Sequence, residues 1–406
     1  MAKKKKQDKT KVYFPGLHGL RFFAALMVIF SHVELLKDYH GYPNLYASNL
    51  AVYESGRIGV TLFFVLSGFL ISYLLLTERK VSGTISIRNF YIRRILRIWP
   101  LYYLLVFLAF IVIPRIPFFT IPEYSAALSQ NFPYTFSLYL LLLPQVALSI
   151  FNPVPFAEPL WSIGVEEQFY LLWPVLLKYF RNFLRLTVVI TVAVILGRQV
   201  VFMLSEANRT SPNLEYWNYL LSYLYFTRIE CMAIGGMGAW LVFRQKSALL
   251  RVIYSRVFQV LLYALTAYLL LTEQNKPIYN YAPYALCFCL IIVNVATNKH
   301  SLLKLENSLF VFLGNISFAM YMFHELIIKL VLELLRTRET TFNDVTSNVV
   351  LHALSIVLTM LVSTAVYYGF ERRFLRLKSR FAVVESGQDL IEKGSPGTPV
   401  PVGATS

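Results

Sequence analysis

The chain has 406 residues, of which 57% are hydrophobic and only 15% are charged. Soluble domains carry about 25% charged residues. The composition therefore excludes a soluble multidomain protein and indicates a membrane protein with many spans. The three cysteines fall in apolar runs, which excludes a disulfide scaffold, and the sequence contains no glycine-rich phosphate-binding motif.

The net charge of +16 does not indicate nucleic-acid binding, because the basic residues flank the apolar runs. Of the 38 lysines and arginines, 26 lie in six short stretches beside such runs: 3–11, 79–97, 178–185, 244–256, 299–304 and 372–380. This placement is typical of the cytoplasmic loops of membrane proteins. Residues 1–12 are therefore expected to form a basic cytoplasmic flank near anionic membrane lipids.

About 20 apolar residues cross a bilayer as a helix. Ten segments qualify and predict an all-α, polytopic transmembrane helix bundle with both termini cytoplasmic: 16–36, 57–77, 97–113, 160–178, 186–204, 220–243, 255–272, 281–298, 308–335 and 346–370. Segment 134–150 is apolar but short and contains Pro144, so we interpret it as a re-entrant or interfacial helix on the outer side. Residues 13–377 then form the membrane domain. Residues 378–406 are expected to be a disordered cytoplasmic tail.

The first span holds a cation and an imidazole. Arg21 and His32 are eleven residues apart, which is about 16 Å along a helix and within about 20° of the same face. Ionisable groups inside a span are costly and mark functional sites. The spacing alone leaves two interpretations open: a functional stripe, or Arg21 at the inner headgroups and His32 at the outer interface.

Three arginines come next, in the inner connection that leads into the third span: Arg93, Arg94 and Arg97. A guanidinium group binds phosphate through two parallel hydrogen bonds, so these side chains could hold a phosphorylated ligand at the inner face. The alternative is that they only set the topology. The run by itself favours the topological role.

The fourth span begins with PLWSIGVEEQFYLLWP, residues 159–174. Ser162, Glu166 and Tyr170 are spaced four residues apart and form one polar line on a helix, beside Trp161. Two adjacent carboxylates are costly at the mouth of a span unless water or a cation reaches them. A helix start at the interface explains the tryptophan residues but not both glutamates, so a functional site is favoured.

Later spans contain further ionisable residues. We interpret Arg228 and Glu230 as a pair in which each charge neutralises the other, and His324, beside Glu325, as a neutral imidazole with one hydrogen bond. The runs GVTLFFVLSGFLIS and AIGGMGAW predict close helix packing. No metal is expected, because the C-x-C pair has no partner ligands nearby in the sequence.

Taken in order, several motifs resemble those of the acyltransferase 3 family of integral-membrane acyltransferases. They are Arg21-x10-His32, LFFVLSGFLIS (62–72), RRILRIWPLYY (93–103), PLWSIGVEEQFYLLWP (159–174) and SFAMYMFHE (317–325). The resemblance covers about residues 13–377. One position departs from the family: the acidic residue that usually precedes Gly-Leu-Arg is His18 here, so no role is carried over to it.

The resemblance implies an acyl-CoA-dependent O-acyltransferase in a bacterial inner membrane. The family moves acetyl or other short acyl groups from cytoplasmic acyl-CoA to hydroxyls of extracytoplasmic glycans, such as O-antigen, exopolysaccharide or peptidoglycan. Some members acylate small natural products instead. Members with an added extracellular hydrolase-like domain pass the acyl group to it. Since no such domain is visible in this sequence, direct transfer to a glycan or glycolipid is expected.

The same resemblance suggests roles for the catalytic residues. His32 would be the general base, because the unperturbed imidazole pKa of about 6.5 suits proton removal from a hydroxyl. Glu166 would orient that imidazole, and Arg21 would neutralise phosphate or developing negative charge. Whether His32 instead carries the acyl group covalently stays open.

The donor would be bound by the arginines. Arg94 and Arg97, with Arg93 beside them, would hold the acyl-CoA phosphates. Further residues are expected near the substrates: Ser162, Tyr170, Trp161, His324 and Arg228. A transporter or flippase is the competing class, since polar stripes through many spans also build substrate pathways. No two related halves with matching broken helices are visible in the sequence, which favours the enzyme.

Overall fold

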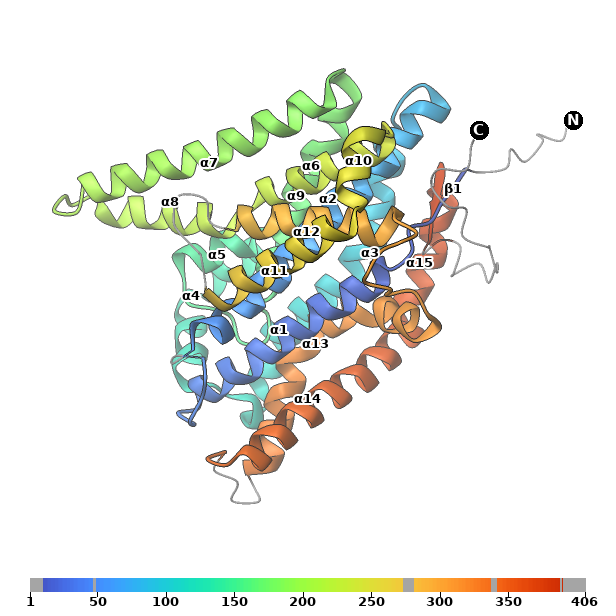
Figure 1. Ribbon diagram of the computed structural model, residues 1–406. Helices are drawn as coiled ribbons and strands as arrows, with labels where there is room; N and C mark the ends of the chain where they lie inside the picture. The colour runs from blue at the N-terminus through green and yellow to red at the C-terminus, as the bar shows by residue number, and fades with distance from the viewer. Residues whose placement is uncertain (1–9, 47–48, 273–280, 337–341, 388, 390–406) are drawn as a thin grey trace, which may run out of the picture.

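The computed structural model describes residues 10–46, 49–272, 281–336, 342–387 and 389. In this part of the chain the main helices are α1 (Leu17–Tyr39), α2 (Leu50–Ser82), α3 (Ile87–Phe107), α4 (Pro122–Leu140), α5 (Pro144–Ile150), α6 (Leu160–Tyr179), α7 (Phe183–Ala207), α8 (Leu214–Phe226), α9 (Ile229–Phe243), α10 (Ser247–Tyr254), α11 (Arg256–Thr272), α12 (Ala282–Thr297), α13 (Ser308–Arg336), α14 (Val345–Val366) and α15 (Arg372–Lys378) (Figure 1). The two short strands are β1 (Thr10–Val12) and β2 (Val384–Ser386).

Six helical segments in the described residues are long and apolar enough to cross a membrane by themselves: Leu17–Tyr39, Ala51–Ser82, Ile87–Arg115, Phe183–Ala207, Leu214–Phe243 and Val345–Phe381. The pair α10 and α11, bent by 66°, would make a seventh. Helices occupy all ten predicted ranges, but α6, α12 and α13 are not among these segments. Glu166, Glu167 and Gln168 lower the hydropathy of α6, and α12 has only 16 residues. The helical membrane architecture is therefore confirmed, whereas the count of ten spans is not.

Glycine residues bring the central helices α2 and α9 into backbone contact. A Cβ atom on Gly68 would lie 1.9 Å from the carbonyl oxygen of Met232, and one on Gly235 would lie 2.2 Å from that of Val65. Any larger residue would push the two helices apart. The prediction of close packing from the two glycine-containing runs is thus confirmed.

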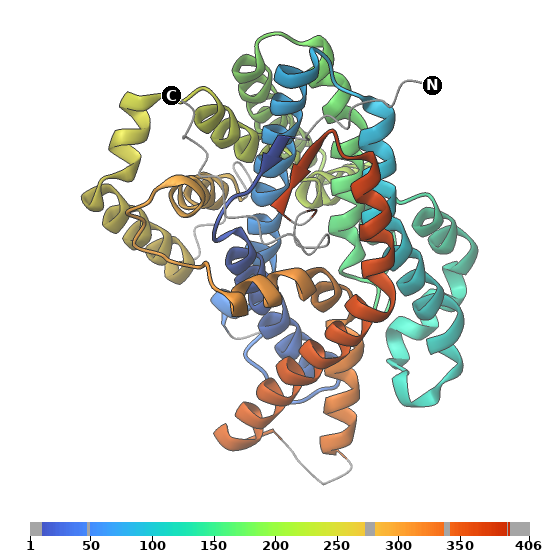
Figure 2. The ribbon, with the colours of Figure 1, turned by 90° about the vertical axis from the view of Figure 1, so that its right-hand side faces the viewer.

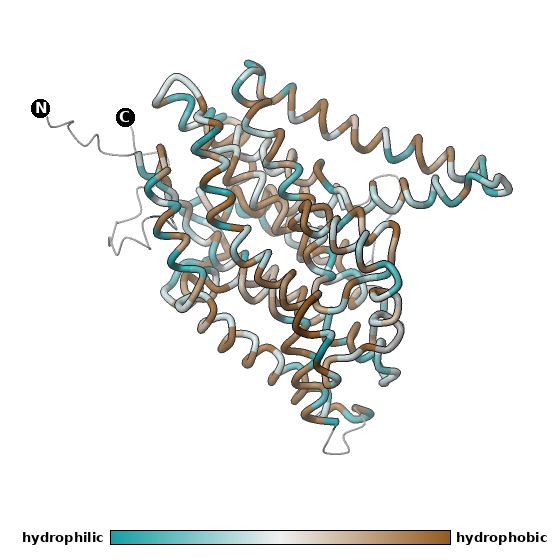
Figure 3. The backbone as a smooth tube through the Cα atoms, turned by 180° about the vertical axis from the view of Figure 1, so that it is seen from behind, coloured by the Kyte–Doolittle hydropathy of each residue, from teal (hydrophilic) through white to brown (hydrophobic). Residues whose placement is uncertain are grey.

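The outward surface of the bundle is apolar. The hairpin of α7 and α8 projects from the other helices (Figure 1), and α7 exposes Val189, Leu196 and Val200 by half or more. Figure 3 shows apolar residues along α7 and polar residues gathered at helix ends and turns. A helix with such an exposed face is suited to lipid rather than to water.

The predicted re-entrant segment 134–150 is broken in its middle. Helix α4 ends at Leu140, Leu142 has a positive φ of 61°, and α5 begins at Pro144. Neither helix passes the test for a span. Helix α5 packs against α6, where a Cβ atom on Gly164 would lie 2.1 Å from the Gln145 side-chain oxygen.

The two ends of the described chain meet at one end of the bundle. Strands β1 and β2 pair in parallel, with Thr10 opposite Val384 and Val12 opposite Ser386, and Figure 2 shows them together on the face toward the viewer. This corrects the expectation of a disordered tail from residue 378, because Val384 is buried in the main apolar core. Residues 390–406 of that predicted tail, and residues 1–9 of the predicted flank, lie outside the described residues.

Candidate functional site

A basic cavity opens beside the β1–β2 pair and extends between α1, α2, α3, α6 and α13. Its volume is about 1260 Å³, including the part open to solvent. Six of the residues singled out in the sequence line it: Arg21, Arg94, Arg97, Ser162, Glu166 and Tyr170. The predicted polar line on α6 therefore faces one common space with the predicted cations.

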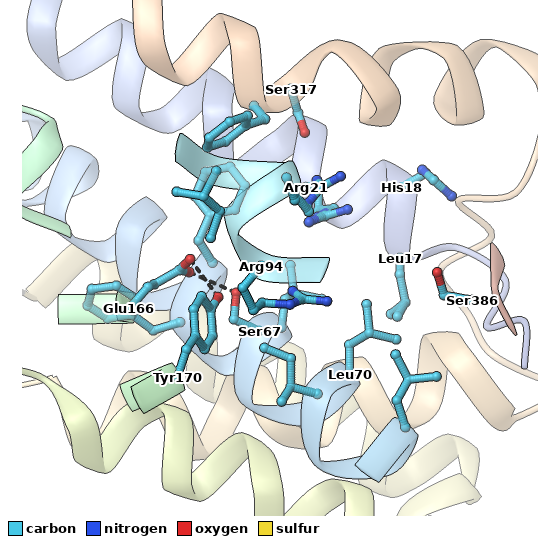
Figure 4. A pocket seen from close by; sticks show the side chains of 18 of the residues that line it. Leu17, His18, Arg21, Ser67, Leu70, Arg94, Glu166, Tyr170, Ser317 and Ser386 are labelled. Atoms are coloured by element: carbon cyan, nitrogen blue, oxygen red, sulfur yellow. Dashed lines mark hydrogen bonds between the residues drawn. The ribbon is translucent and has the colours of Figure 1, made fainter. Parts of the chain in front are cut away.

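Positive charge dominates this basic cavity. Its lining includes Arg21, Arg94, Arg97 and Lys378, and Glu166 is the single carboxylate among the lining residues that the structure describes. Because cations in a low-dielectric cleft raise the local potential, the cavity would attract an anion that carries several charges. Figure 4 shows Arg21 and Arg94 extending into the space, with Ser386 of β2 at its far end.

Glu166 is held by two hydroxyl groups. Ser67 Oγ donates to its Oε1 at 2.8 Å and the Tyr170 hydroxyl donates to its Oε2 at 2.6 Å (Figure 4). The guanidinium carbon of Arg94 lies 5.6 Å from the centre of the Tyr170 ring. Ser67 belongs to the run GVTLFFVLSGFLIS, which predicted only close helix packing, and the structure also gives this residue a polar contact in the cavity.

Arg93 lies apart from the other two arginines. Its guanidinium forms an ion pair with Glu78 at 3.3 Å and donates to the carbonyl oxygen of Phe381 at 2.9 Å. It does not line the basic cavity. The structure thus brings Arg94 and Arg97 to the predicted ligand site, whereas Arg93 ties α3 to α2 and to the segment after α15.

A second cavity surrounds His32, near the other end of α1. This His32 cavity has a volume of about 490 Å³, including its open part. Aromatic rings form two of its walls: Tyr46 and Tyr53 lie 4.8 Å apart, and Trp161 and Phe226 lie 5.2 Å apart. Its charged lining residues are Arg57 and Glu158. Aromatic faces beside charged hydrogen-bonding groups are suited to a polar ring such as a sugar.

His32 is fixed by two neighbours. Its Nδ1 lies 2.8 Å from the carbonyl oxygen of Val28, and its Nε2 lies 3.5 Å from Oε1 of Glu325. Because a carbonyl oxygen only accepts, Nδ1 carries the proton and Nε2 presents a lone pair in the neutral ring. This corrects the prediction that Glu166 orients His32: the carboxylate beside the imidazole is Glu325 of α13, and Glu166 lies in the basic cavity.

His324 lies next to His32. The two ring centres are 4.7 Å apart and the planes are nearly perpendicular. His324 is fully buried, and its Nδ1 makes one hydrogen bond, to the carbonyl oxygen of Tyr321 at 2.8 Å. The ligand atoms of His32, His324 and Glu325 lie within 4.8 Å of one another, so this group could hold a metal ion such as Zn²⁺. A metal there would occupy the lone pair of His32 Nε2.

Arg228 does not pair with Glu230 as predicted. Glu230 forms a buried ion pair with Arg198 of α7 at 2.7 Å, and Arg228 stacks on the Tyr281 ring at 3.6 Å. Arg228 Nη1 also donates to the carbonyl oxygen of Arg57 at 2.9 Å. It lines neither cavity, and its hydrogen bond to Arg57 connects it to α2.

Several residues around His32 were not predicted from the sequence. Arg57 and Glu158 line its cavity, and Tyr321 lines both cavities. Two signals were present: Arg57 is a cation at the start of an apolar span, and Glu158 directly precedes the PLWSIG motif. Tyr321 lies in the motif SFAMYMFHE but was not singled out, because a tyrosine in an apolar helix usually anchors or packs.

Three curated bacterial proteins are similar to this chain. The Listeria monocytogenes peptidoglycan O-acetyltransferase OatA is 30% identical over 183 residues, which is 43% of this chain and 26% of that protein. The Bacillus subtilis putative peptidoglycan O-acetyltransferase YrhL is 32% identical over 201 residues, 48% of this chain and 29% of that protein. The Staphylococcus aureus O-acetyltransferase OatA is 28% identical over 340 residues, 77% of this chain and 50% of that protein.

The chain thus spans half or less of the length of these relatives. No solved structure matches it. The family model described as an acyltransferase domain matches residues 14–368, which include every motif that carried the resemblance. The chain therefore belongs to the acyltransferase 3 family.

Proposed function

We propose that the protein moves a short acyl group, acetyl in the first place, from cytoplasmic acyl-CoA to a hydroxyl of an extracytoplasmic glycan in a bacterial inner membrane. The observation that carries the proposal is the pair of cavities at opposite ends of α1. One is lined by four cations, and the other holds a histidine with a carboxylate beside it.

The basic cavity would be the donor site. In the ten-span topology the β1–β2 end of the bundle is cytoplasmic, where acyl-CoA is found. Arg94, Arg97 and Lys378 would bind the phosphates of CoA. The pantetheine arm would then extend past Glu166 toward the centre of the bundle, and Arg21 of α1 would neutralise charge along the way.

The His32 cavity would be the acceptor site. His32 Nε2 takes the proton of the acceptor hydroxyl, whose oxygen attacks the thioester carbonyl. The C–S bond breaks, and the CoA thiolate leaves and is protonated, so that an ester and free CoA are formed. Glu325, 3.5 Å from His32 Nε2, would stabilise the transient imidazolium by its negative charge. Arg57 is the positive charge on the lining of this cavity and would stabilise the oxyanion.

The relatives favour a glycan over a small natural product as the acceptor, because two of them are named for peptidoglycan. The aromatic walls around His32 support the same class. Among glycans, a peptidoglycan-type acceptor comes first in the test below, and O-antigen and exopolysaccharide are tested beside it.

The test is CoA release by the full chain in lipid nanodiscs, supplied with acetyl-CoA with and without glycan fragments. We expect acceptor-stimulated release that His32→Ala abolishes. His300→Ala is the matched control, since His300 is exposed and lies outside both cavities. Folded protein that releases no CoA with any acyl donor would contradict the proposal and favour a transporter.

A further inference from the structure

The two cavities are separated by a thin wall. Of the described residues that line them, two are common to both: Val60 of α2 and Tyr321 of α13. Both side chains are buried, with 4% and 5% of their surface exposed. Each therefore presents one side to the basic cavity and the other to the His32 cavity.

Hydrogen bonds fix Tyr321 in this wall. Its hydroxyl lies 2.7 Å from Ser162 Oγ and donates to the carbonyl oxygen of Pro159 at 2.9 Å. Pro159 directly precedes α6 and Ser162 lies in its first turn, and Ser162 Oγ is itself 3.1 Å from the same carbonyl. On its other edge the Tyr321 ring packs against Phe63, with ring centres 5.7 Å apart. Contacts with α2 and with the start of α6 hold the ring, which cannot turn away without breaking them.

Tyr321 also adjoins the proposed base. The carbonyl oxygen of Tyr321 accepts the hydrogen bond of His324, whose ring lies 4.7 Å from that of His32. The donor enters from the basic cavity, and the attacking hydroxyl is bound at His32. The thioester carbonyl must therefore reach the wall between the two cavities. The carbons beyond that carbonyl must then fit between Val60 and Tyr321.

We infer that Val60 and Tyr321 form the end wall of the acyl-group pocket and limit the transferred group to a short acyl chain. This inference rests on the proposed transfer from the basic cavity to the His32 cavity. An acetyl group adds one methyl to the carbonyl. A butyryl group adds two further methylenes, which would displace Val60 or break the hydrogen bonds of Tyr321. In apolar pockets one methylene typically changes selectivity by about 10-fold or more.

The experiment is an internal competition. Wild type and variants in nanodiscs receive equal amounts of acetyl-, propionyl- and butyryl-CoA with one glycan acceptor, and the acylated products are quantified by mass spectrometry. The product ratio does not depend on how much of each variant folds. Val60→Ala and Tyr321→Leu enlarge the pocket from its two sides. Val65→Ala removes the same atoms from a buried position on α2 that lines neither cavity.

We expect wild type to favour acetyl, and the butyryl-to-acetyl ratio to rise about 10-fold or more in Val60→Ala and Tyr321→Leu, but less than twofold in Val65→Ala. Tyr321→Phe keeps the ring and loses the hydrogen bonds, so its ratio should rise less than that of Tyr321→Leu. An unchanged ratio in both enlarging variants would overturn the inference and leave acyl transfer intact. An equal rise in Val65→Ala would overturn it as well. If wild type transfers no acyl group at all, the inference fails together with the proposed function.

Discussion

Two conservative substitutions can test which carboxylate is the partner of His32. Glu325→Gln and Glu166→Gln each replace a carboxylate with an amide of the same shape. In the structure Glu325 lies 3.5 Å from His32 Nε2, whereas Glu166 is bound to Ser67 and Tyr170. Only the first substitution should therefore act on the base directly.

The size of the effect follows from the distance. Two unit charges 3.5 Å apart attract by about 5 kcal/mol at an effective dielectric of about 20, and the cost of keeping Glu325 charged in a buried place offsets part of this. The carbonyl oxygen of Val28 already fixes the tautomer of His32, so Glu325→Gln removes the attraction to the imidazolium and not the orientation of the ring. We expect Glu325→Gln to lower kcat by about 10²- to 10³-fold, with the KM for acetyl-CoA little changed.

Glu166→Gln should show the opposite pattern. The amide removes the single carboxylate that faces four cations in the basic cavity and weakens the hydrogen bonds from Ser67 and Tyr170. We expect the KM for acetyl-CoA to change several-fold and kcat to fall much less than in Glu325→Gln. The assay is steady-state acetyl transfer to a glycan at varied donor concentration, with thermal unfolding measured on each variant.

The control is Glu215→Gln, since Glu215 is exposed on α8 and lines neither cavity. If Glu166→Gln abolished kcat while Glu325→Gln retained it, the assignment of Glu325 to His32 would be refuted. The pairing of His32 with Glu166 would then have to form in a conformation other than this one.

Three further predictions concern charges away from His32. Glu230→Gln should lower the free energy of unfolding by about 3–5 kcal/mol, because it leaves the Arg198 guanidinium buried without its ion pair; a denaturant titration in detergent measures this, and an unchanged midpoint would contradict it. Arg94→Ala should raise the KM for acetyl-CoA about 10-fold or more and make that KM less dependent on salt concentration. If the KM depends on salt equally in the variant and in the wild type, Arg94 only sets the topology. Burial alone would raise the pKa of Asp389, but the Lys378 ammonium 3.1 Å away and the Ser386 hydrogen bonds hold it below its ordinary value. The ion pair therefore stabilises the β1–β2 contact above about pH 4, and this stabilisation is lost as the pH falls through the lowered pKa of Asp389. Amide hydrogen exchange at β2 should accelerate in acid in the wild type. Asp389→Asn should show no such acceleration.

Helical periodicity was sufficient to predict which residues share a face. Ser162, Glu166 and Tyr170 were expected on one line because they are four residues apart, and all three line the basic cavity. Arg21 and His32 were expected within about 20° of the same face of α1, and in the structure they line different cavities. In both cases the geometry of a single helix fixes only the face on which the residues lie.

The periodicity of a single helix could not predict contacts between side chains on different helices. A buried ionic group needs a partner, but spacing along one helix cannot say which other helix provides it. Thus Glu230 was assigned to Arg228, two residues away, although side chains at that spacing do not face each other. Its partner is Arg198, on a different helix. The same limit assigned His32 to Glu166 instead of Glu325.

The distance between two packed helices is set by backbone contacts, and the sequence does not say which residues make them. A Cβ atom on Gly59 would lie 2.7 Å from the carbonyl oxygen of Ala24, so α1 and α2 can approach only because this residue has no side chain. Val60 follows Gly59 directly, and this close approach helps to place it in the wall between the cavities. A bulkier residue at position 59 would move α2 away from α1 and open that wall without touching either proposed substrate. Acyl-group selectivity should therefore depend on the size of residue 59 as well as on Val60 and Tyr321, and the competition assay applied to Gly59→Ala can detect this.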